Sequence, residues 1–200
     1  MKYYLFILSI FSLMSCGSSG GNSGGGTASE SAALDGYVMS SLAGSSGEYA
    51  EKRDGAGNLV SSGYVIGEKK NGTWLSYDEE GNRIKTLTSY TDGQLNGPYL
   101  EFSNRGQIEK KIEYKAGQYD GMYVKYKFGR PENETPFVNG QKHGTYKEYF
   151  QNGKIQKEIE FKNGIQDGKL RYFDEEGNVT LEYDYENGEK VGGGMIEKEG

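Results

Sequence analysis

The residues that could do chemistry are few and isolated in this chain. His143 is the single histidine and Cys16 the single cysteine, so a Cys–His nucleophilic pair would need a cysteine that lies beside the apolar N-terminus. His143 occupies a turn-like NGQKHG segment, at a position where the related segments carry Asn96, Asp120 and Asp167. A position that varies in this way is typical of a turn residue. It predicts neither a catalytic nor a metal-binding histidine.

Two acidic segments are candidates for binding calcium. Residues 78–80 and 174–176 each place Asp-Glu-Glu before a glycine. They lack the alternating ligand spacing of a dedicated calcium loop, so we expect solvated hairpin turns. The glycines at 192–194 are followed neither by a helical pattern nor by Lys-Ser/Thr, and they make a poor phosphate cradle. These residue types therefore predict a protein that is not an enzyme and that holds no metal and no cofactor.

A glycine-based repeat organises most of the chain. In each copy a Gly is followed two residues later by a ring or Leu, five residues later by an aromatic, and eight or nine residues later by a second Gly. The copies begin at Gly72, Gly97, Gly121, Gly144 and Gly168, which is a spacing of 23 to 25 residues. A period this short predicts a stack of similar units. The less regular sequence before Gly72, and the incomplete copy at 185–192, are typical of the ends of such a stack.

Alternation between the glycines predicts strands. From 108 to 114 one parity is mostly apolar, with Ile108, Ile112 and Tyr114, while the other is charged, and residues 155–161 and 179–185 alternate similarly. A period of two is the signature of a strand with one face in water. Recurrent DEEGN, NG and DG segments supply residues that tolerate positive φ in hairpin turns. We therefore predict an all-β repeat architecture, in which about six consecutive β-hairpins, the first and last degenerate, form one extended antiparallel meander sheet.

The N-terminus predicts export. Lys2 precedes an apolar run over residues 3–14, which is too short to span a bilayer and ends just before Ser15 and Cys16. The LMSC segment that closes the run resembles a bacterial lipoprotein lipobox, in which the cysteine becomes the acylated first residue. An ordinary cleaved signal with an incidental cysteine is the alternative. Lipid on Cys16 would place the protein in the cell envelope, with the outer membrane or cell surface favoured.

These features divide the chain into three parts. We expect a lipoprotein signal peptide at 1–15, a lipidated cysteine and flexible Gly/Ser tether at 16–34, and the β-hairpin repeat domain at 35–200. The net charge is −6, and cleavage before Cys16 would remove one more positive charge. Lys and Arg alternate with Glu instead of forming a basic stripe, so nucleic acid is not expected as a partner.

A row of aromatic residues is the candidate binding feature. Trp74, Tyr99, Tyr123 and Tyr146 occupy equivalent positions in four copies, and Leu170 takes that position in the fifth. One interpretation is that these side chains pack between neighbouring hairpins. The other is that they form a ligand-facing platform, on which an extended sugar or peptide would stack.

The repeat units resemble a known family. NGQKHGTY at 139–146, GTWLSYDEEGN at 72–82 and GTYKEYFQNGK at 144–154 are similar to the MORN-repeat variant of bacterial proteins grouped as YwqK-family antitoxins. The similarity covers about residues 47–192. It implies a β-hairpin solenoid or open sheet that mediates protein or membrane-surface contact without catalysis. The antitoxin label implies a bound toxin, although an export signal departs from a cytoplasmic antitoxin.

From these observations we expect a non-enzymatic envelope lipoprotein whose repeat sheet is a scaffold for binding another protein. Two alternatives use the same sheet differently. One is a glycan-binding module that uses the repeated aromatics, and the other is an antitoxin or immunity protein that binds a toxin. The residues do not name the partner.

Overall fold

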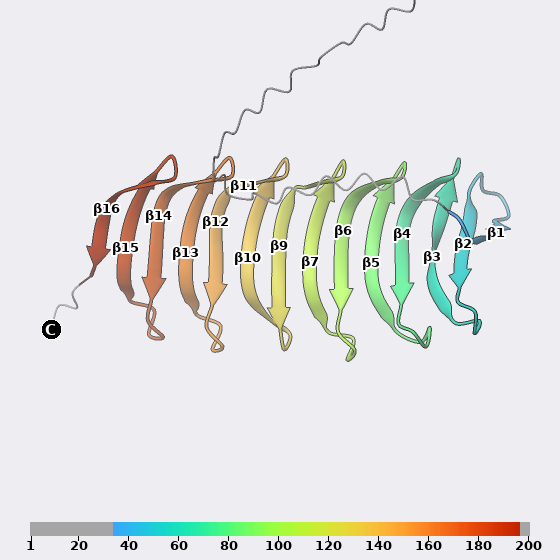
Figure 1. The fold of residues 1–200 in the computed structure, drawn as a ribbon, viewed down its shortest axis with the longest axis horizontal. Helices are drawn as coiled ribbons and strands as arrows, with labels where there is room; N and C mark the ends of the chain where they lie inside the picture. Colours follow the sequence, from blue (N-terminus) through green and yellow to red (C-terminus); the bar gives the residue numbers. More distant parts are fainter. Residues whose placement is uncertain (1–33, 197–200) are drawn as a thin grey trace, which may run out of the picture.

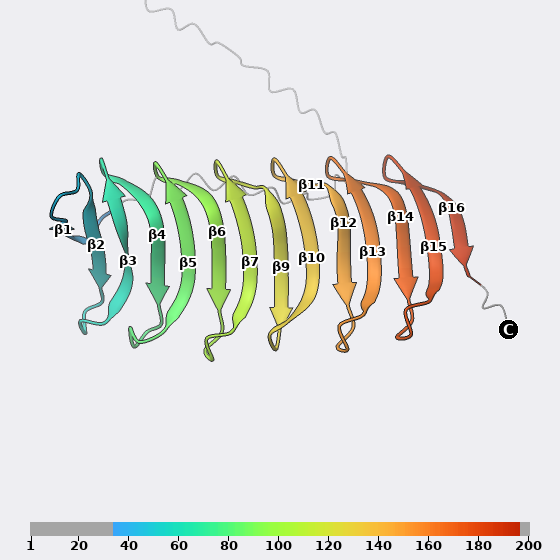
Figure 2. The ribbon, with the colours of Figure 1, turned by 180° about the vertical axis from the view of Figure 1, so that it is seen from behind.

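The computed structural model describes residues 34–196, and the predicted signal peptide, Cys16 and nearly all of the tether lie outside these residues. The described chain forms one sheet of sixteen strands, a single layer without a covering helix (Figure 1). Apart from the two-residue strands at 118–119 and 141–142, strands that follow one another in the chain lie side by side and antiparallel, and both views of the ribbon show this order (Figures 1 and 2). This confirms the predicted all-β meander of hairpins. None of the described residues belongs to a helix that could cross a membrane.

The strands are β1 (Val38–Ser41), β2 (Glu48–Arg53), β3 (Leu59–Ile66), β4 (Lys69–Tyr77), β5 (Ile84–Thr91), β6 (Gln94–Phe102), β7 (Ile108–Lys115), β8 (Gln118–Tyr119), β9 (Gly121–Lys127), β10 (Arg130–Val138), β11 (Gln141–Lys142), β12 (Gly144–Tyr149), β13 (Ile155–Lys162), β14 (Ile165–Phe173), β15 (Val179–Glu186) and β16 (Glu189–Met195). The short strands β8 and β11 pair with β7 and β10, and each directly precedes the longer strand that continues the sheet. Fourteen strands therefore form the continuous path from β1 to β16.

The two long edges of the sheet have different connections. One edge, called the turn edge below, carries two-residue turns whose residues both have positive φ; they are 67–68, 92–93, 116–117, 139–140, 163–164 and 187–188. Such turns match the twist of the strands that they join. The other edge, called the loop edge, carries the longer connections 54–58, 78–83, 103–107, 150–154 and 174–178, together with one two-residue turn at 128–129.

The backbone conformation explains why glycine recurs at the five repeat positions. All of them have positive φ, between 66° and 117°. At Gly168 the space is also closed, because a Cβ there would lie 2.9 Å from Cβ of Glu160. Both the backbone conformation and the neighbouring strand therefore require glycine at this position.

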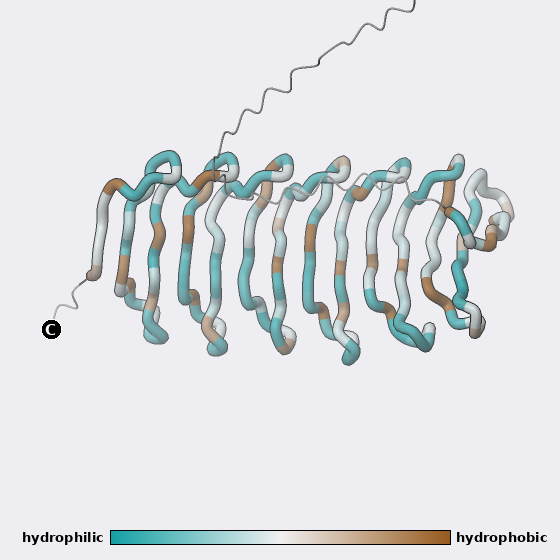
Figure 3. Tube along the Cα trace, in the orientation of Figure 1, coloured by the Kyte–Doolittle hydropathy of each residue, from teal (hydrophilic) through white to brown (hydrophobic). Residues whose placement is uncertain are grey.

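Ile112, Val124 and Leu170 are buried singly along the sheet, and one small buried cluster lies at its N-terminal end. The buried apolar residues of this cluster are Ala50, Val65, Trp74 and Tyr90, and the partly buried Leu34, Tyr37, Met39 and Leu95 pack against them. Elsewhere the hydrophobic segments are short and recur along the whole sheet between hydrophilic ones (Figure 3). Because most of the sheet has no second layer, its rings are half-buried against neighbouring strands.

Candidate functional site

One face of the sheet, called the aromatic face below, carries a row of side chains that runs across the strands. The register places them in the order Trp74, Thr88, Tyr99, Ile112, Tyr123, Thr135, Tyr146, Ile159, Leu170 and Tyr183. The four aromatic residues singled out from the sequence thus lie in one row on one face. Between any two of them stands a Thr or Ile from the intervening strand.

A second row of rings lies beside the first, nearer the turn edge. Tyr90, Tyr114, Phe137, Phe161 and Tyr185 each face a repeat glycine on one neighbouring strand. On the other side these rings face Leu95, Tyr119, Lys142, Gln166 and Lys190 in turn. The partner position therefore changes from apolar to polar towards the C-terminus, although the ring and the glycine stay the same.

Trp74 differs from the other three members of the predicted row. Its side chain is 3% exposed, and Tyr37 covers it edge-on at a ring distance of 5.4 Å. Its indole Nε1 donates a hydrogen bond to the Tyr64 carbonyl at 2.9 Å. A ligand on the aromatic face would have to displace Tyr37 to reach Trp74. Tyr99, Tyr123 and Tyr146 are half-buried and have no such cover within the described chain.

Two of the half-buried tyrosines are held in place by carboxylates. Tyr99 donates from its hydroxyl to Glu101 at 3.3 Å, and Tyr146 donates to Glu148 at 3.2 Å. Burial, together with the Glu148 charge, raises the pKa of Tyr146 to about 12. The phenol therefore stays neutral near neutral pH, and its contribution is an oriented ring and a hydrogen bond.

Lysines stand among the rings of the aromatic face towards its C-terminal end. Lys142 lies 4.9 Å from the Phe161 ring, Lys157 lies 5.2 Å from the Tyr172 ring, and Lys190 lies 3.4 Å from the Tyr183 ring. None of these three ammonium groups forms an ion pair with a carboxylate of residues 34–196. Cation–π contacts of this kind hold an ammonium near a ring without cancelling its charge.

The opposite face is built differently at the same end. Its central row reads Glu134, Lys147, Glu158, Arg171 and Glu182 across β10 to β15, so charges of opposite sign face each other at every step. Arg171 donates to Glu182 at 2.7 Å, and Lys169 is bonded to the same carboxylate. These bases lower the pKa of Glu182. On this face Lys169 and Arg171 are therefore paired with carboxylates, whereas Lys142, Lys157 and Lys190 of the aromatic face form no ion pair with a described residue.

The structure assigns His143 and its equivalents a role that the sequence did not suggest. Asn71, Asn96, Asp120, His143 and Asp167 each accept a hydrogen bond from the backbone N–H of a turn residue in the next hairpin, at 3.1 to 3.4 Å. In parallel, backbone N–H groups of the turn glycines, such as Gly140 and Gly164, donate to carbonyls of the preceding hairpin at 2.8 Å. The turn edge is thus a ladder of hydrogen bonds between repeats, and His143 is one rung.

The acidic turns use their carboxylates internally. Asp78 accepts from the Asn82 N–H at 2.9 Å and from Arg83 Nε at 2.7 Å, and the Arg83 contact lowers the pKa of Asp78. Asp174 accepts from the Asn178 N–H at 2.8 Å. Within residues 34–196 no cluster of His, Cys, Asp and Glu is arranged to hold a metal ion. These loops have the geometry of capped turns.

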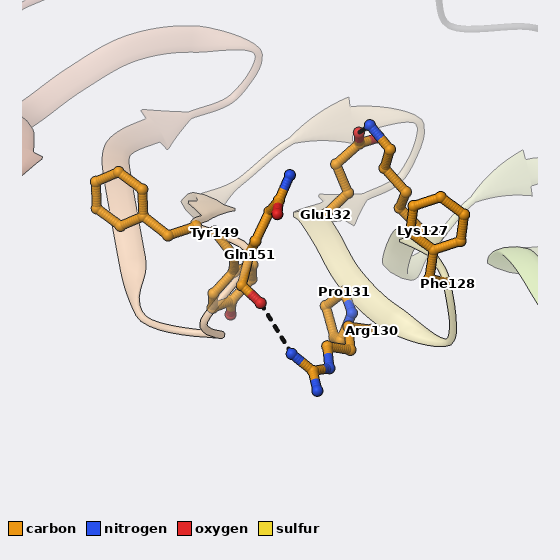
Figure 4. Close-up of a pocket in the computed structure, with 8 residues that line it drawn as sticks. Lys127, Phe128, Arg130, Pro131, Glu132, Tyr149 and Gln151 are labelled. Atoms are coloured by element: carbon orange, nitrogen blue, oxygen red, sulfur yellow. Dashed lines mark hydrogen bonds and ion pairs between the residues drawn. The ribbon is translucent and has the colours of Figure 1, made fainter. Parts of the chain in front are cut away.

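One feature of the loop edge was missed from the sequence. A hollow of about 310 Å³ lies between the 128–129 turn and the neighbouring 150–154 loop, and Figure 4 shows its lining. The available signal was the copy that begins at Gly121, where the second glycine follows after eight residues and not nine. That deletion shortens the connection and opens space beside the next loop.

Comparison with protein families identifies the repeat. Residues 95–116, 142–163 and 166–187 match the model of the MORN repeat variant. Each matched segment begins in or just before one hairpin and ends at the turn that leads to the next. The chain therefore carries MORN-type repeats, and in the structure these repeats form an open antiparallel sheet.

Comparisons with whole proteins add little to this. No curated protein sequence matches the chain. Among solved structures, the chain is similar to a mutant of S. aureus TarM in complex with fondaparinux, alpha-GlcNAc-glycerol and UDP, with 12% identity and a TM-score of 0.36 over 55% of this chain and 21% of that one. A second structure of TarM gives 13% identity and a TM-score of 0.36 over the same shares of the two chains. The matched region spans about a fifth of TarM.

Proposed function

We propose that this MORN-repeat sheet is a non-enzymatic scaffold of the cell envelope, tethered by lipid on Cys16, and that it binds another protein through the aromatic face. The observation that carries the proposal is the row from β6 to β15, in which half-buried tyrosines are spaced by Ile, Thr and Leu side chains and no segment of the described residues covers them. Large rigid rings supply contact area at low entropic cost, and tyrosine is enriched where proteins bind each other.

The lysines among the rings support the same use of this face. Lys142, Lys157 and Lys190 have no carboxylate partner among the described residues, so a partner that brings carboxylates would find complementary charge. The opposite face of β13 to β15 offers less to a partner, because Lys169 and Arg171 are already paired there with carboxylates of neighbouring strands.

Photo-crosslinking from two adjacent residues of β12 tests the proposal. Tyr146 lies on the aromatic face and Lys147 on the opposite face, as their cross-strand partners Ile159 and Glu158 require. A photo-reactive phenylalanine at 146 should capture an envelope protein in cells, and the same group at 147 should not. Capture from neither position, or equal capture from both, would contradict the assignment of the face.

The test also separates the alternatives that share this face. If Tyr123→Ala and Tyr146→Ala lower retention on an envelope polysaccharide while no protein is captured, the face binds glycan. If the captured protein proves to be a toxin, the scaffold acts as an antitoxin or immunity protein.

The proposed anchor has a separate test. Cys16→Ala removes the thiol that acylation needs, so the protein should move from the membrane fraction to the soluble fraction. Unchanged fractionation and unchanged incorporation of labelled fatty acid would rule out lipid on Cys16, without bearing on the aromatic face.

A further inference from the structure

The turn at 128–129 breaks the pattern of the loop edge. The connections at 54–58, 103–107, 150–154 and 174–178 share one arrangement, in which the first residue donates its N–H to the carbonyl of the fifth. Between β9 and β10 this five-residue loop is replaced by Phe128 and Gly129 alone, both with positive φ. A single hairpin is therefore shorter than its neighbours at this edge.

Phe128 is the unusual residue of this turn. Its φ is 53°, in the left-handed region, where a bulky side chain is uncommon. On the turn edge the same conformation is taken by Asp92, Ala116, Glu68 and three asparagines, apart from the glycines. Phe128 is also 82% exposed, so burial within the protein does not offset the cost of the conformation. Strained exposed positions of this kind cluster at ligand sites.

The side chains around this turn form the hollow of about 310 Å³ (Figure 4). Four of its eight lining residues carry an apolar ring, namely Phe128, Pro131, Tyr149 and Phe150. The remaining lining residues are Lys127, Arg130, Glu132 and Gln151. Pockets that bind small organic groups begin at about 300 Å³, so the space suits one or two side chains.

Of the charged side chains in the hollow, Glu132 is neutralised by lysines, whereas Arg130 has no carboxylate partner within residues 34–196. Glu132 pairs with Lys125 at 2.7 Å and lies 4.0 Å from Lys127, so its charge is compensated. The Arg130 guanidinium donates to the Gln151 carbonyl at 2.9 Å and meets no carboxylate among the described residues (Figure 4). Arg130 is thus held in place while its charge stays available, and a guanidinium fork matches a carboxylate in geometry.

We propose that this hollow is a binding site for a short peptide segment in which a carboxylate side chain stands next to an aromatic or aliphatic one. The rings of Phe128, Tyr149 and Phe150 take the apolar side chain, and Arg130 takes the carboxylate. A carboxylate is favoured over a neutral hydroxyl group, because the guanidinium is held in place and its hydrogen bonds to an anion are charge-assisted. The site lies at the loop edge and does not depend on the aromatic face.

Two blocked dipeptides serve as probes in an NMR titration of the purified protein. N-acetyl-Phe-Asp-amide has the proposed chemistry, and N-acetyl-Phe-Asn-amide has the same shape without the charge. The acidic probe should shift the amides of residues 127–132 and 149–151 saturably, and it should bind about tenfold more tightly than the neutral probe, because a hydrogen bond to a charged group is the stronger kind.

Three variants separate the site from the fold. Phe128→Asn places a residue that tolerates positive φ at the turn, so the melting temperature should hold or rise while affinity for the acidic probe falls. Ala116→Asn makes the corresponding change at a turn-edge position with φ of 48°, and it should leave affinity unchanged. Arg130→Gln should remove the preference for the acidic probe over the neutral one.

The proposal is overturned if the acidic probe gives no saturable shifts at these residues, or if Phe128→Asn and Ala116→Asn affect affinity equally. It is also overturned if Arg130→Gln keeps the preference for the acidic probe. Tighter binding of a chito-oligosaccharide at the same residues would show that the ligand class is glycan. These measurements report on the loop edge, so their outcome is independent of the crosslinking result on the aromatic face.

Discussion

The two ends of the aromatic face follow one repeat pattern yet have different surroundings. At the N-terminal end Trp74 is buried beneath Tyr37, and the chain before β2 supplies the cover. Towards the C-terminal end Tyr146 and Tyr183 are half-buried, and no segment among the described residues covers them. Leu170, which lies between them in the row, is buried by its neighbours within the sheet. The same repeated position thus holds a fully covered ring at Trp74 and a half-exposed ring at Tyr146.

This difference teaches that a repeat position has no function of its own. A single-layer sheet buries a side chain only as far as its neighbours on the same face reach. That is enough for Ile112 and Leu170, whereas a ring as large as the Trp74 indole needs a second layer to be covered. Where residues 34–39 provide this layer, the ring contributes stability. Where they do not, the ring remains available, and lysines without carboxylate partners stand beside it.

The largest effect expected from this comparison is that of Trp74→Ala. Removing a buried Trp should cost about 3–5 kcal/mol of unfolding free energy, because the transfer term and the cavity add. Tyr123→Ala, which truncates a half-buried ring in the same row, should cost clearly less. Chemical denaturation followed by circular dichroism measures both. Equal costs would show that the two ends do not differ in burial.

Two glycine-to-alanine variants test how tightly Trp74 is packed. A Cβ at Gly63 would lie 2.5 Å from Cγ of Trp74, so Gly63→Ala must displace the indole and should cost about 1–3 kcal/mol. Gly194, on β16, has no atom within 4 Å of such a Cβ. Gly194→Ala should therefore change the unfolding free energy by less than about 0.5 kcal/mol. Thermal melts of the two variants compare them, and a similar loss in both would count against the tight fit at Trp74.

Removing the Tyr37 ring that covers Trp74 should lower the unfolding free energy less and should clearly change the fluorescence of Trp74. Tyr37→Ala deletes an edge-to-face contact, which is worth about 0.5–1.5 kcal/mol beyond the area that it buries. Trp74 is the single tryptophan, so its emission should shift to the red and become easier to quench. Tyr119→Ala, which removes a ring of the uncovered part, should leave the emission unchanged. An unshifted spectrum in Tyr37→Ala would mean that Tyr37 does not shield Trp74.

The smallest effect concerns the ion pairs at and near the uncovered end. Lys110 lowers the pKa of Glu101, and Lys169 with Arg171 lowers that of Glu182. A lowered folded-state pKa stabilises the fold above the unfolded value, and this contribution is lost as the pH falls through the folded one. The melting temperature should therefore fall below about pH 4.5, and Glu182→Gln should reduce that fall slightly. If the melting temperature falls equally at low pH in the wild type and in Glu182→Gln, the ion pairs of Glu182 do not contribute to the acid sensitivity of the fold.

Much of the fold could be predicted because local rules repeat. The glycines at 72, 97, 121, 144 and 168 demand positive φ, and alternation over 108–114 allows one face in water, so hairpins and their order along the chain follow. The equivalence of Trp74, Tyr99, Tyr123 and Tyr146 likewise placed these residues on one face. Each of these inferences needs only neighbours within one repeat.

The ladder along the turn edge was harder to predict, since its bonds join residues about twenty positions apart. His143 reads as a variable turn residue until the next hairpin places the Asn163 N–H beside it. The charge alternation of Lys147, Glu158 and Arg171 is also hidden in the sequence, because it appears only when the register of three strands is known.

The amino-acid sequence by itself determined the period, the strand pattern and the common face of the rings, since these depend on backbone preferences and on side-chain alternation within some twenty-four residues. Only the tertiary structure decided which rings are covered, which charges find partners, and that a shortened turn opens a hollow beside the next loop. Those outcomes depend on which segments meet in space, and Tyr37 reaches Trp74 across two intervening strands.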